Sequence, residues 1–174
     1  NDILMNQDVG ELAKDIREEV IGDLVDEFMP PDSMEEQWDL PALEAQLAGE
    51  FRMQADVRGW LKANNTLDNA DVKERLIEQV ENEYSEKTEI VGQQTMNGFE
   101  RNVLLQVIDS NWREHLAAMD YLRQGIHLRS YAQKNPKQEY KREAFQMFEN
   151  LWANSKRNVA SLLVSVQIER NEDI

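Results

Sequence analysis

Six basic side chains gather around two tyrosines in one stretch of this sequence, residues 112–143. The basic residues are Arg123, Arg129, Lys134, Lys137, Lys141 and Arg142, and Tyr131 and Tyr140 are interleaved with them. Cationic side chains bind phosphate groups and aromatic rings stack on bases, so one interpretation is contact with a nucleic acid. A second interpretation is contact with protein or lipid headgroups, and a third is plain solvation of an exposed hairpin.

The charge of the whole chain argues against the nucleic-acid interpretation. The formal net charge is −15, whereas nucleic-acid-binding domains usually have a high isoelectric point. Residues 1–100 hold 25 acidic and 8 basic side chains, and residues 101–174 hold 9 acidic and 11 basic ones. We therefore expect no specific nucleic-acid partner. The acidic half either repels anionic surfaces or only keeps the protein in solution.

The histidines and acidic pairs do not form a catalytic pattern. His115 and His127 are 12 positions apart, which fits neither the zincin pair nor a zinc-finger spacing. Glu114 beside His115 is not part of an HExxH motif, and neighbouring acids such as Glu18 and Glu19 diverge around a helix. The chain has no cysteine and no glycine-rich phosphate-binding loop. We predict that this chain has no catalytic residue, no metal site and no nucleotide site of its own.

Apolar spacing predicts that helices position these residues. Steps of three and four predict a helix over residues 8–29, with a buried stripe of Val9, Leu12, Ile16, Val20, Leu24 and Phe28. Pro30 and Pro31 end this helix because neither residue donates the helical hydrogen bond. No apolar run approaches the roughly 18–20 residues that a membrane span needs. The acidic N-terminus also lacks the basic region of a signal peptide.

Residues 30–90 predict a small subdomain of short helices. We expect a capping box of Ser33 and Glu36, a helix that begins at Asp39 and stops at Gly49, and a later helix capped by Asn69 or Asp71. The buried side of this last helix is predicted to hold Val72, Leu76, Ile77, Val80 and Tyr84. Trp38, Trp60 and Tyr84 are interpreted as core residues because each is in register with aliphatic neighbours.

Two long helices are predicted from about residue 91 onward, with the turn marked by Pro136. The first carries an apolar stripe of Met96, Phe99, Val103, Val107, Leu116, Met119 and Ile126. The second carries Tyr140, Ala144, Met147, Leu151, Val159, Leu162 and Val166. Such narrow stripes are typical of antiparallel helix pairs. The predicted fold is therefore all-α, a small helical subdomain plus a long antiparallel two-helix hairpin.

The run SNWREHLAAMDYLRQGIHLRSYAQKNPKQEYKRE, residues 110–143, closely resembles the C-terminal part of the SecA family of ATP-driven preprotein translocases. The runs MPPDSMEEQWDLPALE and EKTEIVGQQTMNGFE resemble the same family more loosely. Ser130 stands where many members have Gly, and Asn135 where Asp is common. The resemblance implies a map: the end of the scaffold helix at 1–29, a helical wing at 30–90, a two-helix finger at 91–168 and a tail at 169–174.

The resemblance also implies partners and contact residues. The finger tip, Ser130, Tyr131, Ala132, Gln133 and Lys134, is expected to meet the preprotein at the SecY channel. Trp112 and Arg113 are expected to contact the motor domains and restrain their ATPase. ATP and Mg²⁺ would belong to those motor domains and not to this chain, self-association is possible, and the location would be the bacterial cytoplasm, peripherally at the inner membrane.

Two other functions compete with this expectation. One is a free-standing helical adaptor that binds partner helices along an unpaired apolar face. The other is RNA binding through the basic tip, which predicts an affinity that falls steeply with salt.

Overall fold

The computed structural model describes the backbone of residues 2–129 and 136–168, and the side chains of residues 8–126 and 137–168. Its elements are α1 (Asp2–Phe28), the 3₁₀ helix η1 (Glu35–Gln37), α2 (Leu40–Phe51), α3 (Val57–Ala63), α4 (Asn69–Val91), α5 (Gln93–Arg129) and α6 (Pro136–Ser165). Every regular element in these two ranges is a helix, so the predicted all-α class is confirmed.

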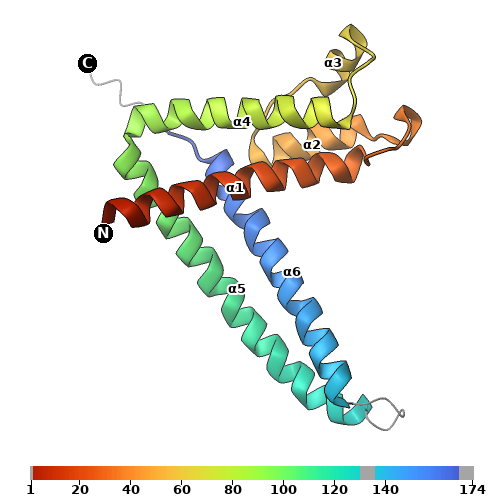
Figure 1. The fold of residues 1–174 in the computed structure, drawn as a ribbon, viewed down its shortest axis with the longest axis vertical. Coiled ribbons are helices and arrows are strands. Elements are labelled where there is room, and N and C mark those ends of the chain that lie inside the picture. The colour runs from red at the N-terminus through yellow and green to blue at the C-terminus, as the bar shows by residue number, and fades with distance from the viewer. Residues whose placement is uncertain (1, 130–135, 169–174) are drawn as a thin grey trace.

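Helix α1 is the centre of the arrangement, because it contacts α2, α4, α5 and α6. Figure 1 shows α1 and α4 running alongside each other, with α2 and α3 near one end of them. Helices α5 and α6 leave this body together as the long antiparallel hairpin that the spacing predicted. One continuous core draws buried residues from all six α-helices. The division at residues 29 and 90 falls near the ends of α1 and α4, and its reading as separate domains stays a prediction.

The buried face of α1 is wider than the predicted stripe. Ile16, Val20 and Leu24 are buried as expected, while Leu12 is 41% exposed, so its placement in the core was wrong. Several helices pack on α1, and a second row of residues fills the space between them: Ala13, Ile21 and Val25. Steps of three and four from Val9 trace one narrow stripe, and they do not indicate on which side a second row will widen it.

Helix α2 begins where the sequence predicts, at a capping aspartate followed by a proline. The Asp39 carboxylate accepts a hydrogen bond from the Ala42 amide at 3.2 Å, and Pro41 occupies the first turn, where its missing donor costs nothing. The predicted stop at Gly49 was wrong. The helix continues to Phe51, whose ring is fully buried, and ends at Arg52 with a left-handed φ of 54°. Burial of Phe51 favours the extra turn.

At the two other predicted helix starts, the residue before the helix is not the predicted one. Asp68 accepts from the Asp71 amide and Asp71 accepts from the Asp68 amide, both at 3.0 Å, so Asp68 caps α4. Asn69 lies inside the helix, and its side chain donates to Asp26 at 3.0 Å, which fastens α4 to α1. Ser33 does not cap a helix. Its hydroxyl accepts a hydrogen bond from the Trp38 indole at 2.9 Å, and only a single 3₁₀ turn forms there.

The aromatic residues of the predicted wing are not all core residues. Tyr84 is buried, as are Val72, Leu76 and Val80 on the same face of α4, while Ile77 is half-buried. Trp38 and Trp60 are only half-buried at the edge of the core. The Arg75 guanidinium lies over the Trp60 ring at 5.6 Å, so this ring faces a cation on its outer side.

Most of the buried side chains of the hairpin lie at its base, and fewer are buried in its far half. In α5, Met96, Val103, Val107 and Ile126 are buried and Phe99 and Met119 are half-buried, as predicted. In the second stripe Val159 is buried, and the half-buried members are Tyr140, Ala144, Met147, Leu151 and Val166. Leu116 and Leu162 were wrongly placed in the core, since they are 50% and 47% exposed. Leu163 is buried in place of Leu162.

Polar contacts fasten the base of α6 to the body. The Arg157 guanidinium donates to both carboxylate oxygens of Glu50 in α2, at 2.6 and 2.7 Å. The Ser161 hydroxyl donates to the Glu50 carbonyl at 2.9 Å, and Lys156 pairs with Glu19 of α1 at 2.6 Å. These contacts join the base of α6 to α1 and α2.

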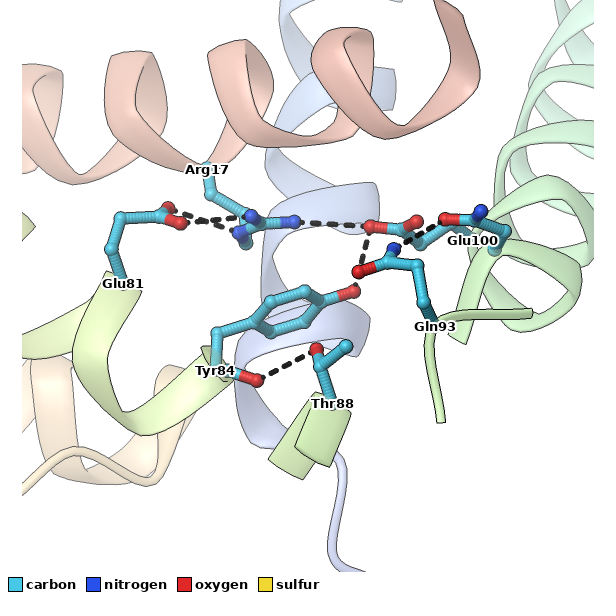
Figure 2. A network of polar contacts seen from close by, with 7 residues as sticks. Arg17, Glu81, Tyr84, Thr88, Gln93 and Glu100 are labelled. Atoms are coloured by element: carbon cyan, nitrogen blue, oxygen red, sulfur yellow. Dashed lines mark hydrogen bonds and ion pairs between the residues drawn. The ribbon is translucent and has the colours of Figure 1, made fainter. Parts of the chain in front are cut away.

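A buried charged cluster lies where α1, α4 and α5 meet (Figure 2). We call Arg17, Glu81, Tyr84 and Glu100 the corner cluster. The Arg17 guanidinium donates to the two carboxylate oxygens of Glu81, at 3.1 and 2.9 Å, and to Glu100 at 3.3 Å. Arg17 and Glu100 are only 3% and 2% exposed. The guanidinium also lies 3.6 Å from the centre of the Tyr84 ring, so one side chain ties together three helices.

Candidate functional site

The predicted finger tip lies outside the described residues. This applies to Ser130, Tyr131, Ala132, Gln133 and Lys134. Arg129 is the last residue of α5, and its side chain is likewise outside the described set. The structure places the ends of α5 and α6 on either side of this segment. The assignment of the tip as a contact site therefore stays a prediction.

The basic residues beside the tip belong to both helices of the hairpin. Arg123 pairs with Asp120 on α5, and Arg142 pairs with Glu139 on α6 at 2.7 Å. Both arginines are 69% exposed, and each partner lies three residues before it on the same helix. Lys137 and Lys141 are exposed. The two ion pairs reduce the positive charge that this region presents to an anionic partner.

Trp112 and Arg113 lie on the outside of α5. Trp112 is 44% exposed, so it is not a core residue. Its ring is 5.2 Å from the His115 ring, which in turn meets the Phe148 ring of α6 edge-on at 6.2 Å. The Arg113 guanidinium pairs with Asp109 one turn earlier at 3.1 Å, and both side chains are largely exposed. Trp112 is therefore open to solvent and lies next to His115, which makes the ring contact with α6.

Trp112 is part of a larger apolar surface that the sequence analysis missed. We call it the hairpin apolar face, and its members are each 42–64% exposed: Leu105, Ile108, Trp112 and Leu116 of α5, with Phe145, Phe148 and Trp152 of α6. Their spacings of three and four residues put each set on one side of its helix. The chain of ring contacts from Trp112 through His115 to Phe148 joins the two sets.

The signal for this face was present in the sequence as a second stripe. Steps of three, four and four from Leu105 to Leu116 repeat the helical period beside the core stripe. Leu116 fits both stripes, and it was placed in the core one. Exposed apolar side chains that gather on one face are typical of contact surfaces.

The titratable side chains in the described part of the chain were also compared with the sequence predictions. Among those residues no three His, Asp or Glu side chains come together as a metal site would require. His115 lies between the rings of Trp112 and Phe148. A groove of about 400 Å³ runs along the hairpin between α5 and α6, and its lining includes Asn111, Asn150 and Asn154 beside charged and apolar residues. None of the described helices has the length and apolar character to cross a bilayer.

Comparison with known proteins matches this chain to a protein family. Residues 1–167 match the SecA wing and scaffold domain. The protein translocase subunit SecA of Neisseria meningitidis serogroup A is 68% identical over 171 residues, which are 98% of this chain and 19% of that protein. The subunit of the same name from Chromobacterium violaceum is 49% identical over 174 residues, the full chain and 19% of that protein.

The match covers nearly the whole chain, including α1, the short helices and the hairpin. The chain spans about a fifth of the length of these curated relatives. This chain therefore belongs to the SecA wing and scaffold family.

Proposed function

We propose that this chain is a non-catalytic module of a preprotein translocase, which acts through surface contacts during protein export. The observation that carries the proposal is the hairpin apolar face, seven large apolar side chains left uncovered in a chain that spans a fifth of its relatives. Burying such side chains against a partner stabilises the complex by the apolar area removed from water. The partner we propose is the motor portion of the same translocase.

In this proposal the hairpin acts at both ends. Trp112, with Arg113 beside it, docks on the motor and restrains ATP hydrolysis, while Tyr131 and its neighbours at the tip contact the preprotein at the SecY channel. ATP and Mg²⁺ would be bound by the motor portion. The complex would work on the cytoplasmic side of the bacterial inner membrane, and it would include the SecY channel, the preprotein and the remainder of SecA.

The hairpin apolar face also favours a second function, a helical adaptor that binds partner helices without any motor. The two functions differ in one measurable consequence, because only the first requires that binding changes ATP hydrolysis. RNA binding gains no support from the described basic residues, since Arg123 and Arg142 already pair with acids of their own helices.

The test is to add this chain to a SecA motor portion that lacks its own wing and scaffold, and to measure both binding and ATP hydrolysis. We expect the chain to bind and to lower hydrolysis. Trp112→Ala should weaken binding by roughly 30-fold, because truncating a buried aromatic anchor costs about 2 kcal/mol. The restraint on hydrolysis should weaken with it.

Tyr121→Ala is the matched control for Trp112→Ala. Tyr121 lies on the same helix, is 80% exposed and is not a member of the hairpin apolar face. Its loss should leave binding and hydrolysis as they are with the unaltered chain. Binding without any change in hydrolysis would support the adaptor instead, and equal effects of the two substitutions would contradict the assignment of the face.

A further inference from the structure

The corner between α4 and α5 is made by a single residue. Helix α4 ends at Val91 and α5 begins at Gln93, with Gly92 between them at a φ of 90°. This is a backbone conformation that glycine adopts freely and other residues avoid. A one-residue glycine corner does not hold two helices at a fixed angle by itself. Side-chain contacts across the corner must supply that restraint.

The corner cluster supplies contacts of this kind. The Tyr84 hydroxyl of α4 donates to the Glu100 carboxylate of α5 at 2.9 Å, directly across the corner. Arg17 of α1 reaches the same Glu100 oxygen at 3.3 Å and holds Glu81 of α4 with its other nitrogens. Figure 2 shows the four side chains converging from the three helices. The Glu100 carboxylate is the point at which all three helices are joined.

The cluster is not balanced in charge. Two carboxylates face one guanidinium, and the second Glu100 oxygen, Oε1, is buried without a hydrogen-bond partner. Burial raises the pKa of Glu100, against the lowering effect of the Tyr84 hydroxyl and Arg17. Burial and the Glu100 charge also raise the pKa of Tyr84, so its hydroxyl remains a donor. An ionised Glu100 therefore sits at a cost in the closed corner, because one of its oxygens has lost water and gained nothing.

A cavity large enough for water lies beside this carboxylate. A cavity of about 460 Å³ opens between α1, α4 and α5, and Glu100, Arg17 and Tyr84 are among its lining residues. The other charged groups that face it are Glu11 and Lys14 from α1 and Glu81 from α4. A small rotation of α5 about Gly92 would admit water to Oε1.

We propose that Glu100 makes the α4–α5 corner a proton-sensitive clasp. With Glu100 protonated, the corner stays closed on α1. With Glu100 ionised, the carboxylate takes up water from the adjacent cavity and the corner loosens at Gly92. The sign follows from linkage: the closed form binds the proton more tightly than the opened form, so lower pH favours closure. The mechanism depends on this chain's own residues and stands apart from the proposed function.

A small opening at this corner would displace the far end of the hairpin by a larger distance, because α5 is long. Its 37 residues span about 55 Å at 1.5 Å per residue, so an opening of roughly 5° moves its far end by about 5 Å. The corner lies where the hairpin leaves the body (Figure 1). The protonation of one buried carboxylate would therefore set how freely the hairpin swings.

The chain has no cysteine, so a pair of spin labels can be introduced at chosen sites. Exposed positions on either side of the corner are Asn82 on α4 and Ala117 on α5. Pulsed electron spin resonance then gives the distance distribution at pH 5 and pH 8. We expect a narrow distribution at pH 5. At pH 8 we expect a broader one, with its mean shifted by about 3 Å for 5° of opening over the roughly 37 Å from Gly92 to Ala117.

Two substitutions and a control assign the effect to Glu100. Glu100→Gln keeps the shape and removes the titration, so its distribution should be narrow at both pH values. Tyr84→Phe removes a donor that favours the ionised form, so its transition should move to higher pH. Glu149→Gln, at an exposed acid of α6, should respond to pH as the unaltered chain does. Equal distributions at both pH values in the unaltered chain, or a pH response that survives Glu100→Gln, would overturn the proposal.

Discussion

Arg17→Met is expected to lower the free energy of unfolding by about 3–5 kcal/mol, the loss typical when one partner of a buried ion pair is removed. Methionine fills most of the space but leaves Glu81 and Glu100 facing each other without a cation. The guanidinium contact with the Tyr84 ring is lost as well. A loss of this size is a large share of the unfolding free energy of a domain, which is usually about 5–15 kcal/mol. Urea unfolding followed by circular dichroism measures it.

Arg113→Met is the matched control for this prediction. Arg113 also pairs with an acid, Asp109, but its side chain is 77% exposed, so its loss should cost less than about 1 kcal/mol. The cost of Arg17→Met should also shrink as the pH falls, because protonation of Glu100, whose pKa burial already raises, removes the uncompensated charge. A cost for Arg17→Met no larger than that for Arg113→Met would show that the corner cluster contributes little.

Leu24→Ala is expected to lower the free energy of unfolding by about 2–5 kcal/mol through the lost apolar contact and the cavity left behind. Leu24 is 0% exposed in the middle of the core that α1 shares with the other helices. No neighbouring element can collapse into the gap without losing its own contacts, because α1 is packed by several helices at once. Chemical denaturation of the variant measures the loss.

Leu12→Ala makes the same change on the same helix at a site that the spacing placed in the core and the structure places at its edge. Leu12 is 41% exposed, so the loss should be about 1 kcal/mol or less. Equal losses at the two positions would contradict the burial pattern of α1. The comparison therefore tests the structure against the simpler prediction from periodicity.

Periodicity predicted which segments are helices but not where each helix packs. Pro30, Asp39 and Pro136 have direct effects on the backbone, and the helix ends near them were predicted well. Leu116 and Leu162 were misplaced because the apolar spacing along one helix does not show where the neighbouring helix packs against it. Gly49 failed as a stop for a similar reason, since burial of Phe51 outweighs the helix-weakening effect of a glycine.

The corner cluster was beyond sequence reasoning for a further reason. Arg17 is 64 positions from Glu81 and 83 positions from Glu100, and charged residues are usually at the surface. Trp112, in contrast to the corner cluster, was singled out before the structure was known. Its predicted role as a motor contact follows from the family resemblance, and the structure adds that it belongs to a face of seven residues.

The most direct test of the central claim is preprotein transport by a complete SecA translocase that carries this segment with Tyr131→Ala. The claim is that the hairpin acts on the preprotein. It predicts that transport into membrane vesicles falls while folding and basal ATP hydrolysis persist. Tyr121→Ala, at an exposed tyrosine of α5 that is not one of the tip residues 130–134, should transport normally. Transport by the Tyr131→Ala protein at the rate of the unaltered protein would contradict the account.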